Sequence, residues 1–190
     1  LADEVHRQLR TRIVTGALRP GDALRDCVLA ERMGISRSPV REGLRTLELS
    51  GLVEKSANRS YRVSTLAPVD LPELALLRLA DETLAIRIIV QQHITVDALR
   101  PALSAMKTVP DSLLEIVEAD TAFHSAVVRL AGSPRLTSRF TQLTDQLQLF
   151  LMNEGARGTQ RRDALIESHA QLYDELSNAV TLGDPRPAIK

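Results

Sequence analysis

Apolar residues near the start of the chain recur every three or four positions, which is the period of a helix with one buried face. Val5, Leu9 and Ile13 predict a first helix near residues 2–15. Gly16 can end this helix, and a Pro-Gly pair at 20–21 marks a turn. A second, short helix is predicted to end near Met33, before a glycine that allows a tight turn.

A third predicted helix, which follows Ser36 as a possible cap, carries two stripes side by side. Val40, Leu44 and Leu47 form its apolar stripe. The neighbouring stripe is basic, because three positions four residues apart are occupied by Arg37, Arg41 and Arg45. One helix can therefore pack on a small core and present three guanidinium groups to solvent.

This basic stripe suits nucleic acid. A helix fits the major groove of DNA, and arginine offers a fork of donors that reads guanine or holds phosphate. Ser36 and Ser38, at the start of the helix, could add phosphate contacts. The alternative is a solvated helix face that happens to carry arginines. Three arginines in register directly after a short turn favour DNA.

After the third helix the apolar period changes to that of short strands. Residues 52–55 and 61–64 predict a hairpin, with residues 56–60 as its loop. A hairpin that follows a recognition helix is a wing, and Arg59 near its tip could enter the minor groove or contact phosphate. An exposed loop arginine without a role is the alternative interpretation.

Together these segments resemble the GntR family of bacterial winged-helix regulators. The resemblance rests on Gly16-Ala-Leu-Arg-Pro-Gly-Asp-Ala-Leu24, Leu29-Ala30, Met33-Gly-Ile-Ser-Arg-Ser-Pro-Val-Arg-Glu42, Leu44, Leu47 and Gly51-Leu-Val53. It implies that Arg37 and Arg41 contact operator DNA, and it extends with less support to Ser36, Ser38 and Arg45.

Two residues, Gly43 and Ser60, depart from the family pattern. Gly43 occupies a usual alanine position, at an expected cost of about 0.5–1 kcal/mol in helix stability. Ser60 replaces a common wing glycine, and Cys27 stands where some members carry a DNA-contacting arginine.

Beyond residue 67 the strand signals end and helical periodicity continues to the end of the sequence. Breaks near residues 95, 110, 132–134, 155–158 and 183–187 divide this part into about five helices and the start of a sixth. The predicted fold is therefore mostly α, with a winged helix-turn-helix domain at 1–66 and an all-α antiparallel helical bundle at 67–190. We expect this second domain to continue past Lys190.

Two ionisable residues interrupt the apolar stripe of the helix predicted near 112–131. Asp120 and His124 lie in the middle of that stripe, and His169 lies within an apolar stripe on a later helix. Inward polar groups need a partner, a ligand or a metal ion, and this donor set suits zinc, nickel or manganese. Hydrogen-bonded core residues are the alternative interpretation.

The segment Asp120-x-x-Phe123-His124, with Leu130-Ala-Gly132, also resembles the FadR C-terminal (FCD) type of effector domain. The resemblance implies a FadR-like subgroup and a small organic-acid effector. Metal-binding members usually have one Asp and three His, and the last His would fall beyond this sequence. The spacing also allows Tyr173 to take the place of His169, which would favour a metal-free effector pocket.

Two arginines are candidates for binding a carboxylate effector. Arg78 lies along an apolar stripe four residues before Glu82, so it could face a carboxylate ligand or form an internal ion pair with that glutamate. Arg139, beside another apolar stripe, is a second candidate.

The two predicted domains differ in net charge. The 190 residues carry no net charge, but residues 1–66 hold 12 Lys and Arg against 8 Asp and Glu, a balance of +4, and the rest balances at −4. A polyanionic partner is therefore expected for the first part only. Chance variation in surface charge is the alternative.

Composition bounds the location and the kind of partner. The only cysteine, Cys27, excludes an internal disulfide and favours the cytoplasm. No apolar run reaches the roughly 18 residues that a membrane span needs, so no membrane partner is expected.

The sequence thus predicts a cytoplasmic, homodimeric transcription regulator and not an enzyme. A repressor of double-stranded operator DNA that responds to a small carboxylate is the leading hypothesis, because a two-fold protein matches a two-fold site. One rival is a metal-dependent hydrolase that uses Asp120, His124 and His169. Another is a winged-helix regulator whose helical domain only dimerises.

Overall fold

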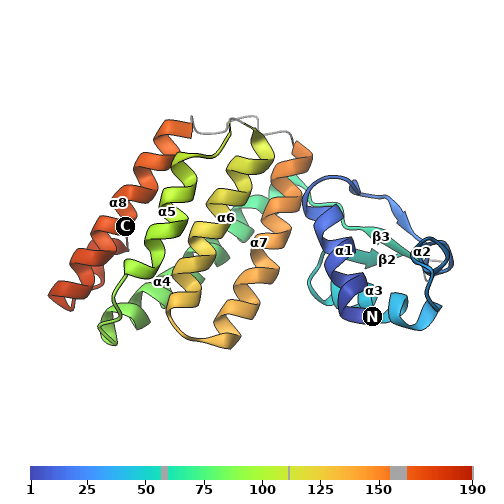
Figure 1. The fold of residues 1–190 in the computed structure, drawn as a ribbon, viewed down its shortest axis with the longest axis horizontal. Coiled ribbons are helices and arrows are strands. Elements are labelled where there is room, and N and C mark those ends of the chain that lie inside the picture. The colour runs from blue at the N-terminus through green and yellow to red at the C-terminus, as the bar shows by residue number, and fades with distance from the viewer. Residues whose placement is uncertain (57–59, 111, 155–161, 190) are drawn as a thin grey trace. The chain divides into compact units, whose positions relative to one another are not determined.

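A computed structural model describes residues 1–56, 60–110, 112–154 and 162–189. The chain divides into two compact units (Figure 1). The first comprises Leu1–Pro72 together with the C-terminal part of helix α7 from Asp145. The second contains Glu73–Thr144 and the last helix. No described helix is both long and apolar enough to cross a membrane.

The first unit is a winged helix-turn-helix. Its elements are α1 (Ala2–Val14), β1 (Ala23–Leu24), α2 (Asp26–Met33), α3 (Arg37–Leu49), β2 (Val53–Lys55) and β3 (Tyr61–Val63). Gly34 adopts φ 65° at the end of α2, the left-handed conformation that lets the chain turn sharply into α3. The antiparallel sheet has the order β1-β3-β2, with Val53 opposite Val63. The predicted hairpin is confirmed, and β1 is an additional third strand.

The apolar stripes predicted for α1 and α3 form the core of this unit. Their buried members are Val5, Leu9, Ile13, Val40, Leu44 and Leu47. Leu149 of α7 is buried in the same cluster. Ser36 does stand before the first turn of α3, but its side chain makes no capping hydrogen bond. The start of α3 is therefore held by the turn and by packing of the helix rather than by a serine cap.

Gly43 lies where α3 passes close to α1. A Cβ atom at this position would lie 2.8 Å from Val5 Cγ1 and 3.1 Å from the backbone nitrogen of His6. Helix propensity alone favours alanine here, but the close approach of the two helices excludes a side chain. The glycine is therefore a packing requirement of α1 against α3.

Replacing Gly43 with alanine is expected to destabilise the protein by about 1–3 kcal/mol, because the added methyl overpacks the helix contact. Urea unfolding measures the change, and Thr46→Ala, on the exposed side of the same helix, should change stability by less than about 0.5 kcal/mol. Val5→Ala in the Gly43→Ala background should recover part of the loss. A Gly43→Ala protein more stable than the native one would contradict this interpretation.

The second unit is a bundle of helices, as predicted. Its elements are α4 (Leu71–Gln91), α5 (Arg100–Lys107), α6 (Leu113–Leu130), α7 (Pro134–Glu154) and α8 (Arg162–Leu182), with short 3-10 turns at Asp97–Leu99 and Arg186–Ala188. Figure 1 shows α8, α5, α6 and α7 next to one another, with α4 behind them. Ser112 caps α6 by accepting a hydrogen bond from the backbone N–H of Glu115. Fully buried side chains from several helices fill the core, among them Ile89, Leu99, Met106, Phe123, Phe140 and Leu176.

Candidate functional site

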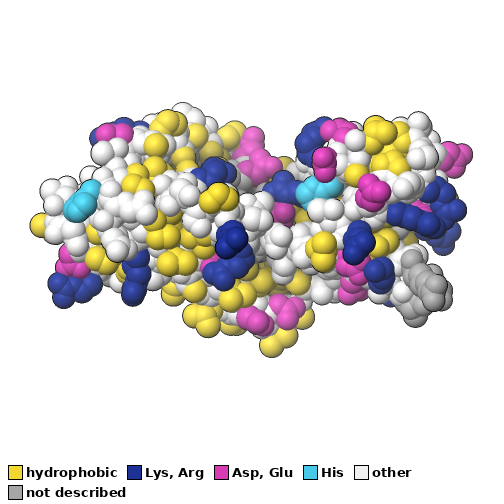
Figure 2. Space-filling model, turned by 90° about the horizontal axis from the view of Figure 1, so that it is seen from below, with side chains coloured by type: hydrophobic (Ala, Val, Ile, Leu, Met, Phe, Trp, Pro, Cys, Tyr) yellow, Lys and Arg dark blue, Asp and Glu magenta, His cyan; other side chains and the backbone are white. Residues whose placement is uncertain are grey.

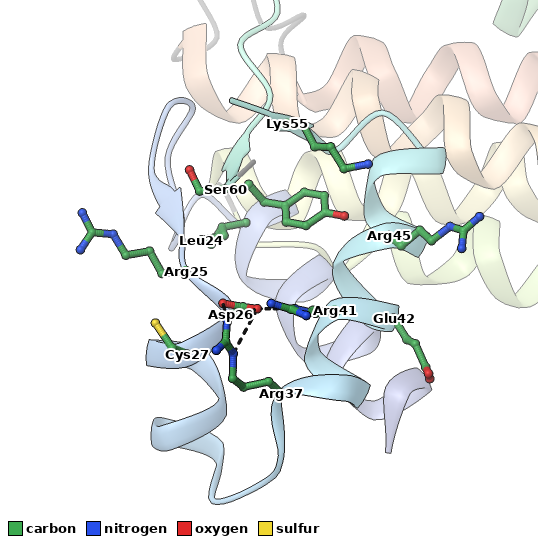
Figure 3. A pocket seen from close by; sticks show the side chains of 11 residues that line it. Leu24, Arg25, Asp26, Cys27, Arg37, Arg41, Glu42, Arg45, Lys55 and Ser60 are labelled. Carbon is green, nitrogen blue, oxygen red and sulfur yellow. Dashed lines mark hydrogen bonds and ion pairs between the residues drawn. The ribbon is translucent and has the colours of Figure 1, made fainter. Parts of the chain in front are cut away.

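The basic stripe of α3 is exposed as predicted, and part of it is held by an acid from α2. Arg37 Nη2 lies 3.0 Å from Asp26 Oδ2, and Arg41 Nε lies 2.5 Å from the same oxygen. Both arginine side chains stay more than half exposed. The carboxylate thus fixes two guanidinium groups side by side at the start of α3 (Figure 3).

Further cations surround this pair. Arg25, Arg45 and Lys55 line the same open hollow, and Figure 3 shows Arg25 and Arg45 pointing away from Asp26. Hydrogen bonding from Arg41 and Arg37 outweighs burial and lowers the pKa of Asp26, so this group stays ionised. Figure 2 shows Lys and Arg side chains gathered on the surface of this unit. Such a surface favours a polyanion.

The remaining predicted DNA contacts occupy different positions. Ser36 and Ser38 are exposed at the start of α3 but do not line the hollow. Arg59 lies outside the described residues. Sequence reasoning did not predict Arg25, Asp26 or Lys55 as members of this face. The sequence shows that Asp26 is acidic, but not that it contacts Arg37 and Arg41, which lie eleven and fifteen residues away on another helix.

In the second unit, the three inward polar residues meet. Asp120 and His124 of α6 and His169 of α8 each offer one ligand atom, and these atoms all lie within 4.8 Å of one another. The Nε2 atoms of the two histidines are 3.0 Å apart. Asp120 Oδ1 lies 3.2 Å from His169 Nε2 and 3.6 Å from His124 Nε2. His169 is buried, and the other two are partly buried.

The opposite nitrogen of each histidine is also occupied. His124 Nδ1 lies 2.8 Å from Glu82 Oε2, and His169 Nδ1 lies 2.7 Å from the backbone oxygen of Leu165. These oxygens accept hydrogen bonds, so each Nδ1 carries the proton when its imidazole is neutral. The two Nε2 lone pairs then face each other and Asp120 Oδ1. Such an arrangement needs a cation, either a proton or a metal ion, between its members.

Arg78 supports the cluster from α4. Its Nη2 lies 3.0 Å from Asp120 Oδ2, and its Nε lies 2.8 Å from Glu82 Oε1. The sequence left two alternatives for Arg78, a carboxylate effector or an internal ion pair with Glu82. In the structure it pairs with two internal carboxylates, Glu82 and Asp120. Asp120 therefore receives Arg78 on one oxygen and faces the histidines with the other.

Burial and charge act against each other on these groups. Burial alone would raise the pKa of Asp120, but hydrogen bonds from His124 and His169 and the charge of Arg78 outweigh it and lower that pKa. Burial would also raise the pKa of Glu82, but the hydrogen bond with His124 and the charges of His124 and Arg78 outweigh it and lower that pKa. Burial would lower the pKa of His124, but Asp120 and Glu82 raise it. The carboxylates are ionised and attract a cation.

The donor set fits a divalent metal ion. Two imidazole nitrogens and one carboxylate oxygen are ordinary ligands of zinc and related metals. Ligand nitrogens about 2.0–2.1 Å from one ion lie roughly 3.3 Å apart in tetrahedral geometry, close to the 3.0 Å between the two Nε2 atoms. Hydrogen bonds that orient the far nitrogen of each histidine are typical of metal ligands.

The other two predicted effector residues have different surroundings. Tyr173 is buried in the apolar core, and the guanidinium of Arg100 lies 5.3 Å from its ring centre. No hydrogen bond or ring contact within the described chain joins Tyr173 to His124 or Asp120. Arg139 forms an ion pair with the buried Asp81 of α4 and keeps an exposed side chain.

Comparison with known protein families covers both units. The model of bacterial regulatory proteins of the gntR family matches residues 1–63, and the FCD domain model matches residues 73–180, which is more than half of the chain.

The chain belongs to the GntR family, with an FCD domain as its second unit.

Individual relatives agree with this assignment. A probable D-xylose utilization operon transcriptional repressor of Paenarthrobacter nicotinovorans is 31% identical over 99% of this chain and 82% of its own length. The HTH-type regulator YdhC of Bacillus subtilis is 24% identical over 91% of this chain and 79% of its own length. A putative GntR regulator structure from Rhodococcus sp. RHA1 shares the fold with a TM-score of 0.81 at 22% identity, covering 98% of this chain and 90% of its own.

As a GntR-type regulator, the protein binds DNA to control transcription, and its FCD domain is an effector-binding domain. It is not an enzyme, since the matching family consists of transcriptional regulators. The hydrolase alternative therefore receives no support. The Asp120, His124 and His169 cluster lies inside the effector-binding domain.

Proposed function

We propose that this regulator binds a two-fold operator as a homodimer and that a small carboxylic acid controls its affinity for that DNA. The acid would bind beside a divalent metal ion held by Asp120, His124 and His169. Arg37, Arg41 and Arg45 would contact the operator. Ser36, Ser38 and Arg59 would contribute phosphate contacts. Repression relieved by the acid is the proposed direction, since one relative is named a probable transcriptional repressor.

The observation that carries the proposal is the 3.0 Å approach of His124 Nε2 and His169 Nε2. Both far nitrogens face oxygen acceptors, so neutral imidazoles present two lone pairs to the same point as Asp120 Oδ1. Three protein ligands leave further coordination positions open, and a bound ion would supply positive charge at those positions.

Charge explains why the effector would be an anion. Asp120, Glu82 and Arg78 together carry a net charge of −1 when the histidines are neutral. A divalent ion changes this balance to +1, which favours a carboxylate ligand. Arg78 would hold Asp120 and Glu82 in place rather than contact the effector itself, because both of its bonded nitrogens have internal partners. Arg139, whose side chain is exposed although it pairs with Asp81, would be the arginine that contacts the effector, and Tyr173 would support the pocket from the core.

Metal content tests this proposal. The native protein, purified without chelator and dialysed against zinc, is expected to hold one ion per chain. Asp120→Ala/His124→Ala should hold none, since one remaining histidine does not make a site. His6→Ala, which alters a histidine of the first unit, is the matched control and should hold the native amount. A native protein without metal would contradict the proposal. It would favour a metal-free pocket in which a proton, and not a metal ion, lies between Asp120, His124 and His169.

A further inference from the structure

Helix α4 leaves an apolar face without any partner in the described chain. Four leucines on this helix, Leu76, Leu77, Leu79 and Leu84, are between 45% and 65% exposed, and Leu76 and Leu84 share one side of it. Single exposed leucines are common, but several on one helix mark an interaction surface. Figure 2 shows hydrophobic side chains on the surface of the helical unit.

The exposed residues of this face are spaced symmetrically about one alanine. Residues 73, 76, 80, 84 and 87 follow one another at intervals of three or four, so they share one side of the helix. All five are exposed. Ala80 stands at the centre with a leucine four residues away on each side. The acidic Glu73 lies at one end of this face, and the basic Arg87 lies at the other.

This order is self-complementary under two-fold symmetry. Two copies of α4 that cross antiparallel at Ala80 pair residues at equal distances from that alanine. Leu76 of one copy then meets Leu84 of the other, and Glu73 meets Arg87. The small side chain of Ala80 allows the helices to approach closely at the axis. A parallel arrangement would instead place like charges opposite each other.

The charged ends are free to make such contacts. Neither Glu73 nor Arg87 forms an ion pair with another described residue, whereas other acids and arginines of the helical unit, such as Asp81 and Arg78, are paired. We propose that the α4 face, formed by Glu73, Leu76, Ala80, Leu84 and Arg87, is the dimer interface and that its occupant is the α4 face of a second copy of this chain. The inference deepens the proposed function, since it rests on the proposed homodimer and identifies its interface.

Cysteine cross-linking at the symmetry axis tests the register. In a Cys27→Ser background, which removes the exposed native thiol, Ala80→Cys places two cysteines next to each other across the axis. Oxidised glutathione is expected to convert this protein to a disulfide-linked dimer. Ala75→Cys, which is exposed on the opposite side of the same helix, is the matched control and should stay uncross-linked.

A charge exchange gives an independent readout by sedimentation equilibrium. Glu73→Arg and Arg87→Glu each place like charges together twice per dimer, and each should weaken association by about tenfold. Glu73→Arg/Arg87→Glu restores opposite charges and should associate within about twofold of the native protein. A structural role of either residue within its own chain would not produce this recovery.

Cross-linking and sedimentation together distinguish a wrong interface from the absence of a dimer. A native dimer in which Ala80→Cys fails to cross-link and the double exchange fails to recover would overturn the α4 interface, while dimeric operator binding would stand. A native chain that remains monomeric at micromolar concentration and on operator DNA would overturn both.

Discussion

Replacing both Arg37 and Arg41 with alanine is expected to weaken binding to the specific operator by about 10²–10⁴-fold. Each arginine that contacts a base edge contributes about 1–3 kcal/mol of discrimination, and the two guanidinium groups lie together on α3. Fluorescence anisotropy at fixed salt measures the affinity, on an operator selected from random DNA by the native protein. The fold should be unaffected, because both side chains are mostly solvent-exposed.

Arg7→Ala is the matched control for this experiment. Arg7 is an exposed arginine of the same unit, and it pairs with the exposed Glu4 on α1. Its replacement removes one positive charge from the unit, against two in the double variant, so it should reduce operator affinity only slightly, through the general attraction of DNA for cations. Native operator affinity in Arg37→Ala/Arg41→Ala would show that another surface reads the DNA.

Removing Arg78 is expected to destabilise the metal-free protein by about 3–5 kcal/mol. Its guanidinium is the only arginine or lysine partner of Asp120 and Glu82 in the described chain, and both carboxylates are largely buried. Breaking such a pair leaves uncompensated buried charge. Urea unfolding of Arg78→Ala at neutral pH measures the loss, and Arg135→Ala, an exposed arginine of the same unit, should change stability by less than about 0.5 kcal/mol.

The pH dependence of this loss has a definite sign. The pKa values of Asp120 and Glu82 are lowered in the native protein, so their contribution is present above the ordinary values of 3.8 and 4.5 and is lost as pH falls below them. Arg78→Ala raises both pKa values toward or above those values. The stability difference should therefore be largest near neutral pH and shrink as pH falls through this window. A stability difference that stays constant from pH 7 to well below pH 3.8 would mean that Arg78 acts through packing and not through charge.

Local patterns in the sequence predicted what depends on one element at a time. The arginine stripe of α3 and the inward positions of Asp120 and His124 follow from helical period alone, and the structure has them as expected. The strand β1 escaped prediction because two residues are too few to show an alternating pattern. The packing role of Gly43 was also hidden, since it depends on how closely α1 passes.

Contacts between distant elements were the part that the sequence could not supply. Helical period indicates which face of α4 is inward, but not which helix lies opposite that face. The links from Arg78 to Asp120 and from Glu82 to His124 each join residues 42 positions apart. Similarly, Asp26 meets Arg37 and Arg41 only because the turn at Gly34 brings α2 and α3 together.

We propose that a ligand at the Asp120, His124 and His169 cluster controls operator affinity. The most direct test titrates operator DNA with the zinc-loaded protein, with and without a mixture of citrate, malate and lactate. We expect the acids to shift operator affinity by about 5–150-fold, the usual range of coupling between two sites. In Asp120→Ala/His124→Ala that shift should vanish while the basal affinity stays within about threefold. A shift of native size in this variant would show that the acids act at another site and that this cluster does not control operator affinity.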